Sequence, residues 1–181
     1  MRLFIAIQFS PALRESLLDA AGQLRSQCLE GRFTTPENLH LTLAFIGEVP
    51  SDKPARRALE TLSFSPFSLS LEGSGHFREL WWAGLHRSRE LDKLARDVRQ
   101  ALKQQGLTID EKPFRPHITL ARQTRWETPI HLEIAPASMT VEAVSLMESR
   151  RINGKLTYIE RFRQPAQPQQ EIGRASCRER V

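Results

Sequence analysis

Two short segments of the chain each carry a histidine and a threonine two positions apart. His40 and Thr42 lie in the sequence NLHLTLAFIG, and His117 and Thr119 lie in HITLAR. In an extended strand, residues i and i+2 project from the same face about 6 to 7 Å apart, so each segment presents an imidazole beside a hydroxyl. If the two strands line one cleft, two imidazoles and two hydroxyls surround a space that suits a phosphate group.

This set of side chains fits displacement at phosphorus. An in-line displacement needs a base on the entering oxygen and an acid on the leaving oxygen, on opposite sides of the phosphorus. Two histidines can supply both near neutral pH, because a pKa of about 6.5 allows one neutral and one protonated ring. The threonine hydroxyls can donate hydrogen bonds to the non-bridging oxygens. One His-x-Thr alone is weak and fits a half-exposed sheet residue, whereas two copies in apolar alternating segments favour a catalytic site.

The elements that position these residues can be read from the spacing of apolar side chains. Period-two alternation predicts strands at residues 3–9, 38–47, 67–71, 80–85 and 117–122. Helical spacing predicts helices at residues 11–31, 52–62 and 88–106. Gly73 and Gly75 are expected to form the turn between two of the strands, and Asn153-Gly154 predicts a hairpin of residues 141–152 and 155–162. This order favours an α+β fold with antiparallel sheets and two related halves over a parallel doubly wound sheet.

Three stretches of the sequence resemble one known family. The segments NLHLTLAFIGEV and PFRPHITLAR, with the N-terminal RLFIAI, are similar to the 2H phosphoesterase superfamily, and specifically to the bacterial and archaeal RNA 2',3'-cyclic phosphodiesterases once called 2'-5' RNA ligases. The resemblance runs from about Arg2 to Arg163. It implies a bilobal fold of two antiparallel sheets with pseudo-twofold symmetry, helices packed outside and a central cleft. It also implies metal-independent hydrolysis of cyclic phosphates to 2'-phosphomonoesters, with 2'-5' ligation as the reverse reaction.

The resemblance also implies roles for the paired residues. His40 matches the proton donor to the departing 3' oxygen, and His117 matches the proton acceptor that activates water. Thr42 and Thr119 match the hydroxyls that bind the phosphate. The spacing of the residues by itself does not assign donor and acceptor.

Two arginines are candidates for a further contact with the phosphate. Arg115 shares the face of His117 by the i, i−2 rule, whereas Arg122 falls on the opposite face unless the strand has ended there. Arg122, however, better resembles the basic residue that follows the second motif in the family. A guanidinium of either residue could grip a phosphate with two hydrogen bonds.

The aromatic and remaining histidine residues give weaker signals. Phe45 sits on the core-facing register of its strand, so packing is expected rather than stacking on a base. Trp81 and Trp82 are adjacent and must point to opposite faces, so at most one of them can reach a cleft. The other histidines lack partners at metal-ligand spacing and are expected on the surface: His76, His86 and His131.

Composition and charge limit the possible partners and compartment. The chain has 181 residues, of which 40% are hydrophobic and 26% charged, and a formal net charge of +5. No apolar run approaches the roughly 20 residues that cross a bilayer, so we expect a cytoplasmic protein with no membrane partner. A positive balance suits RNA ends or small cyclic-phosphate nucleotides as partners. We expect a monomer with no cofactor and no metal.

The C-terminal part of the sequence is expected to lie outside the fold. A single bilobal domain over residues 1–163 would be followed by a disordered exit, QPAQPQQ, at residues 164–170. Residues 171–181 (EIGRASCRERV) resemble the translation of a sequencing adapter and are interpreted as an artefact.

Two other functions compete with a cyclic phosphodiesterase. The first is an RNA-binding module without catalysis, which would need positive charge and a tryptophan but neither histidine. The second is a metal-dependent hydrolase with His40 and His117 as ligands, although no Asp or Glu accompanies either motif at a suitable spacing.

Overall fold

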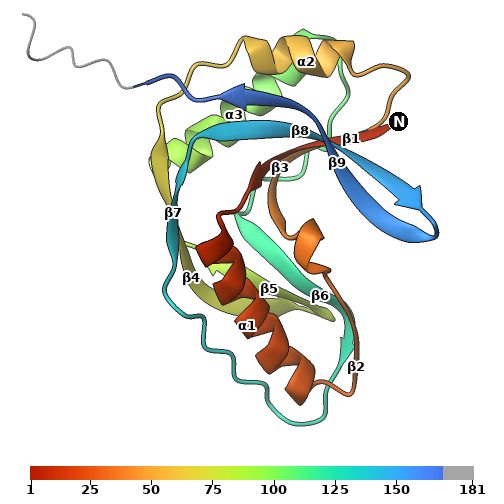
Figure 1. Ribbon diagram of the computed structural model, residues 1–181, viewed down its shortest axis with the longest axis vertical. Coiled ribbons are helices and arrows are strands. Elements are labelled where there is room, and N and C mark those ends of the chain that lie inside the picture. The colour runs from red at the N-terminus through yellow and green to blue at the C-terminus, as the bar shows by residue number, and fades with distance from the viewer. Residues whose placement is uncertain (169–181) are drawn as a thin grey trace, which may run out of the picture.

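The computed structural model describes residues 1–168, which form two β-sheets and three α-helices (Figure 1). In chain order the elements are β1 (Arg2–Gln8), α1 (Pro11–Gln27), β2 (Glu30–Phe33), the 3-10 helix η1 (Pro36–Asn38), β3 (His40–Glu48), α2 (Lys53–Glu60), β4 (Phe67–Phe77), β5 (Leu80–Leu85), α3 (Arg89–Gln104), β6 (His117–Arg125), β7 (Ser138–Val141), β8 (Ala143–Ile152) and β9 (Lys155–Pro165).

Every pair of neighbouring strands is antiparallel. The four-stranded sheet has the order β3-β1-β8-β9, and the five-stranded sheet has the order β2-β6-β5-β4-β7. The predicted α+β class with two antiparallel sheets is therefore confirmed. The two His-x-Thr segments begin β3 and β6, which belong to different sheets and contact each other.

The first and last helices each pack on the sheet that they do not follow. Helix α1 leaves β1 of the four-stranded sheet but packs against β2, β6 and β7 of the other sheet. Helix α3 leaves β5 of the five-stranded sheet and packs mainly against α2 and β3 of the other sheet, with a smaller contact to β4. Figure 1 shows α1 across the lower sheet and α2 with α3 above the upper one. The two sheets consequently share one cluster of buried apolar residues, which includes Ile5 of β1 and Leu120 of β6.

Two short strands were not predicted from the sequence. Helix α1 ends at Gln27 and not near Gly31, because Glu30–Phe33 forms β2 and pairs with β6. Strand β7 covers only four residues and pairs with β4 at the edge of the sheet. Both are edge strands whose pairing partners, rather than their own apolar pattern, stabilise the extended backbone.

The turn between β4 and β5 is also not where the glycines indicated. It lies at Arg78 and Glu79, with Arg78 in the left-handed conformation at φ 52°, so β4 continues through Gly73 and Gly75. Gly75 is needed for close packing, because a Cβ there would lie 2.4 Å from Cζ2 of Trp82. The prediction of a turn at the two glycines was wrong, since glycine also serves close approach inside a strand.

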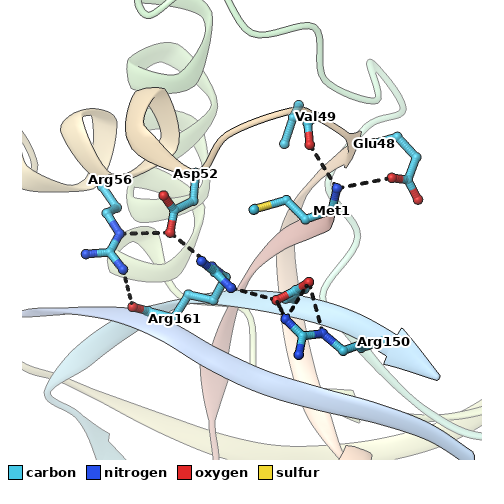
Figure 2. Close-up of polar contacts among 8 residues, drawn as sticks. Met1, Glu48, Val49, Asp52, Arg56, Arg150 and Arg161 are labelled. Carbon is cyan, nitrogen blue, oxygen red and sulfur yellow. Dashed lines mark hydrogen bonds and ion pairs between the residues drawn. The ribbon is translucent and has the colours of Figure 1, made fainter. Parts of the chain in front are cut away.

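A cluster of charged residues fastens α2 to the hairpin of β8 and β9 (Figure 2). The Arg161 guanidinium donates hydrogen bonds to Asp52 Oδ2 at 2.9 Å and to Glu148 Oε2 at 2.8 Å. Arg56 also binds Asp52, and Arg150 also binds Glu148. The side chains of Asp52 and Glu148 are only 13% and 6% exposed, so both carboxylates depend on these partners.

The pKa values of these groups follow from the same contacts. The hydrogen bond from Arg161, helped by Arg56, holds the pKa of Asp52 below its usual value. Burial acts to raise the pKa of Glu148, but hydrogen bonds from Arg150 and Arg161 outweigh it and the pKa is lowered. Both carboxylates are therefore ionised at neutral pH.

The hairpin turn and the end of β9 test two further predictions. Asn153 and Gly154 have φ values of 51° and 75°, so the predicted hairpin is confirmed. The sequence predicts a disordered segment from residue 164. In the structure β9 instead continues to Pro165, and the backbone N–H groups of Ala166 and Gln167 are hydrogen-bonded to the carbonyls of Glu142 and Phe64. Residues 169–170, and the adapter-like segment 171–181, lie outside the described residues.

None of the helices formed by residues 1–168 is both long enough and apolar enough to span a lipid bilayer.

Candidate active site

His40 begins β3 and is held by backbone and side-chain contacts. Its Nδ1 lies 2.6 Å from the carbonyl oxygen of Asn38, and its Nε2 lies 2.8 Å from Thr42 Oγ1. A carbonyl can only accept a hydrogen bond, so Nδ1 carries the proton and Nε2 is the basic nitrogen of the neutral ring. The Asn38 side chain is itself fixed by donating to the carbonyl of Leu156. The predicted pairing of imidazole and hydroxyl is thus present in β3.

His117 begins β6 in the same way. Its Nδ1 lies 2.6 Å from the carbonyl oxygen of Arg115, two residues earlier, just as His40 bonds to the carbonyl two residues before it. Nδ1 of His117 is therefore also protonated, and Nε2 is left for chemistry. His117 is exposed and Thr119 is half-buried, between Ile118 and Leu120, which are fully buried.

Both strands contain a β-bulge immediately after the threonine. In the pairing of β1 with β3, Ala6 lies opposite Thr42 and Ile5 opposite Ala44, so Leu43 is an extra residue. In the pairing of β5 with β6, the extra residue is Leu120. A bulge places two successive side chains on one face and shifts the alternation by one residue for the rest of the strand. The fifth residue after each histidine therefore returns to the face of the histidine and threonine.

One consequence of the bulges concerns Arg122. It is exposed and lies on the face of His117 and Thr119, whereas simple alternation had placed it on the opposite face. Its guanidinium also acts on the Tyr158 phenol of β9: burial raises the pKa of Tyr158, and the charges of Arg122 and Arg2 oppose this. The shared face makes Arg122 a candidate to contact a ligand of His117 and Thr119.

Arg115 lies just before β6, and its side chain is exposed. Its carbonyl oxygen positions His117, but its side chain precedes the strand on which Thr119 lies. Arg122 is therefore the stronger of the two candidates for a phosphate contact.

The other consequence of the bulges concerns Phe45. The prediction that it packs in the core is wrong: Phe45 is 55% exposed and lies on the face of His40, with its ring 6.5 Å from that of Phe4. The two tryptophans do point to opposite faces. Trp81 is buried, and Trp82, which pairs with Thr119, is half-buried on the candidate-site face. His76, His86 and His131 are exposed, as predicted.

Two aromatic rings enclose His40, and neither was predicted. The Phe4 ring lies 4.9 Å from the imidazole, and the Tyr158 ring lies edge-on at 5.1 Å. This burial lowers the pKa of His40, while the hydrogen bond to the carbonyl of Asn38 acts to raise it. The ring is therefore neutral in the free protein near pH 7. The sequence gives only a weak signal for these two aromatic rings, because Phe4 belongs to an apolar run and Tyr158 to a polar strand.

Two hollows of the described surface lie apart from His40 and His117, which line neither of them. A hollow of about 340 Å³ includes Arg122 in its lining, together with Arg32 and Phe77. A larger one, of about 800 Å³, lies around His76, Trp81 and Trp126, and Trp81 belongs to the opposite face of the sheet. Register and hydrogen bonding therefore define the candidate site better than concavity does. Within residues 1–168, no three His, Cys, Asp or Glu side chains gather as a metal site.

Comparison with known proteins identifies relatives over most of the chain. A family model described as the 2'-5' RNA ligase superfamily matches residues 12–153. A protein of Archaeoglobus fulgidus named RNA 2',3'-cyclic phosphodiesterase is 37% identical over 132 residues, covering 69% of this chain and 74% of the relative. A protein of the same name from Geobacillus stearothermophilus is 33% identical over 166 residues, covering 85% of this chain. The chain spans only 53% of that second relative, about half its length.

The fold also matches a solved structure with a bound nucleotide. The crystal structure of Escherichia coli LigT complexed with 3'-AMP superposes with a TM-score of 0.80 at 29% sequence identity. The match covers 91% of this chain and 97% of that one. The likeness therefore includes both sheets and the helices between them.

Proposed function

Because the chain belongs to the 2'-5' RNA ligase superfamily, we propose that it hydrolyses RNA ends carrying a 2',3'-cyclic phosphate to 2'-phosphomonoesters. The observation that carries this proposal is the repeated arrangement in β3 and β6. Each strand begins with a histidine whose Nδ1 is held by the carbonyl two residues earlier, followed by a threonine and a bulge. Two contacting strands thus each present one Nε2 atom and one hydroxyl.

In the proposed reaction, a water molecule attacks phosphorus from the side opposite the 3' oxygen. Nε2 of His117 accepts a proton from this water as the new P–O bond forms. Nε2 of His40, protonated, gives its proton to the 3' oxygen as the P–O3' bond breaks. The products are a 2'-phosphate and a free 3'-hydroxyl, with the two histidines left in exchanged protonation states.

The remaining candidate residues bind the phosphate in this proposal. Thr42 and Thr119 donate hydrogen bonds to its non-bridging oxygens, and the charge of Arg122 offsets the charge that develops there. Protonation of His40 frees the Thr42 proton for this purpose, because a protonated Nε2 no longer accepts a hydrogen bond from Thr42 Oγ1. Phe45 offers an exposed ring on the same face for the terminal base.

Product analysis tests the function directly. A short oligoribonucleotide ending in a 2',3'-cyclic phosphate is expected to give only the 2'-phosphate, at the same rate in excess EDTA. A 3'-phosphate product would contradict the proposed roles of the two histidines. Tight binding of the oligonucleotide without turnover would instead support an RNA-binding module, and loss of turnover in EDTA would support a metal-dependent hydrolase.

We further propose that the enzyme is a cytoplasmic monomer that needs no cofactor.

The buried position of His40 predicts the pH dependence. A proton donor must be charged, and burial lowers the pKa of His40, so kcat/KM should fall as pH rises through a value below 6.5. The profile of kcat should extend to higher pH, because the bound anionic phosphate favours the charged ring. Tyr158→Ala, which exposes the imidazole, should move the alkaline limb of kcat/KM towards 6.5. An alkaline limb above pH 6.5 in the unmodified enzyme would contradict the donor role of His40.

A further inference from the structure

The candidate-site face of the five-stranded sheet continues past Arg122 to a second group of basic and aromatic residues. Arg32 of β2 pairs with Arg122 of β6, so the two side chains project from the same face. On β4 and β5, the pair of Phe77 and Leu80 lies two residues beyond the pair of Gly75 and Trp82 and so also shares this face. The hollow of about 340 Å³ lies here, lined by Arg32, Phe77, Arg78, Glu79, Leu80, Arg122 and Gln123.

The lining of this hollow suits a single strand of nucleic acid. Phe77 is 71% exposed, the highest value among the exposed large apolar side chains of residues 1–168, and the Arg78 guanidinium carbon lies 5.9 Å from its centre. The hollow collects three arginines, from β2, β6 and the turn after β4, against the one carboxylate of Glu79. Aromatic platforms interleaved with positive charges bind single-stranded RNA by stacking on bases and attracting phosphates.

The hollow is also held in shape by the backbone. Arg78 and Gln123 both have φ values of 52°, a conformation that is uncommon for residues other than glycine. Thr124 fastens the turn of β4 and β5 to β6, because its N–H and its hydroxyl both donate to the carbonyl of Glu79, at 3.1 and 2.7 Å. A site ordered before binding loses less entropy when the ligand binds.

We infer that this hollow, the Phe77–Arg78 hollow, binds the nucleotides that precede the terminal one in the RNA chain. Thr119 and Arg122 are separated by about 10 Å or less of strand, so the strand of RNA need only continue along β6 to reach the hollow. The substrate class is accordingly an oligoribonucleotide end rather than a mononucleotide cyclic phosphate. This inference rests on the proposed function.

The test compares two substrates in variants of the hollow. Phe77→Ala removes the exposed ring, and Arg78→Gly removes the guanidinium while keeping a residue that favours the positive φ, so neither change should disturb the fold. Each should lower kcat/KM for an oligoribonucleotide 2',3'-cyclic phosphate about tenfold and leave a mononucleotide 2',3'-cyclic phosphate unaffected. Arg78→Lys should retain part of the preference for the oligoribonucleotide over the mononucleotide substrate. The control is Arg57→Ala, at an exposed arginine of α2, which should retain all of this preference.

Binding measurements separate failure of this inference from failure of the proposed function. Fluorescence anisotropy of a labelled single-stranded oligoribonucleotide should show weaker binding for Phe77→Ala. For Arg78→Gly the slope of log K against log salt should fall by about one. An enzyme that hydrolyses neither substrate, but loses RNA affinity in these variants, would refute the proposed function and support the hollow. The inference would be overturned if the variants lost kcat/KM equally on both substrates or bound the oligoribonucleotide as tightly as the unmodified enzyme. It would also be overturned if the variants affected only the use of a 5'-hydroxyl strand in ligation.

Discussion

Replacing His117 or His40 with alanine should lower kcat/KM on a 2',3'-cyclic phosphate substrate by about 10² to 10⁴-fold. This range is the usual loss when a general acid or base is removed while the remaining binding groups stay in place. His117 is exposed, so its replacement should leave the thermal unfolding temperature unchanged. Steady-state kinetics on purified variants, with a thermal melt of each, measures both quantities.

The control for this experiment is His131→Ala, the same substitution at an exposed histidine in the segment before β7. It should retain full activity. His40 is enclosed by Phe4 and Tyr158, so a lower melting temperature for His40→Ala alone would reflect lost packing. Activity of His117→Ala within threefold of the unmodified enzyme would end the two-histidine mechanism, because no packing argument applies there.

The largest effect on stability is expected from Arg161→Met. The substitution keeps most of the side-chain volume but leaves the buried carboxylates of Asp52 and Glu148 short of a positive partner (Figure 2). Because Arg56 and Arg150 still pair with these carboxylates, the loss of the Arg161 hydrogen bonds should cost about 1.5 to 3 kcal/mol of unfolding free energy. Arg163→Met, at an exposed arginine of the same strand, should change it by less than about 0.5 kcal/mol. Urea unfolding of both variants checks the prediction, and equal midpoints would contradict it.

Acid should abolish the difference between Arg161→Met and the unmodified protein. The pKa values of Asp52 and Glu148 are lowered in the folded protein, so their stabilising contribution is present above the ordinary carboxyl pKa of about 4. It is lost as pH falls through the lowered values. Adding Glu148→Gln to Arg161→Met should recover part of the stability at pH 7, since a buried charge that has lost one of its two arginine partners is then removed. No recovery would show that packing of the Arg161 side chain accounts for the loss.

Local patterns predicted the elements that carry the two motifs. Alternation located β1, β3 and β6, and Asn153-Gly154 located the hairpin of β8 and β9, because these strands bury one or both faces and their side chains must follow the pleat. The same periodicity predicted that the side chains of His40 and Thr42 lie side by side on one strand. The contact between β3 and β6 did not follow from it, since packing between strands of two different sheets leaves no mark in either segment.

The positions of Arg122 and Phe45 could not follow from strict alternation, because each lies beyond a bulge. A usable signal was nevertheless present. Both motifs continue His-x-Thr-Leu-Ala, and two successive apolar residues in a strand that otherwise alternates indicate a bulge. Phe4 and Tyr158 left no such signal, because a ring in a buried strand is ordinary and its position over an imidazole depends on how three strands align.

The way in which α1 and α3 each cover the sheet they do not follow affects how the protein loses its structure. Each sheet combines strands from both halves of the polypeptide, so a fragment of either half would leave both sheets incomplete and expose apolar surface. Melting should then be a single cooperative event for the whole molecule. The same interlocking resists hinge-like separation of the halves, and a rigid frame suits chemistry in which two rings must keep a constant span across one substrate atom.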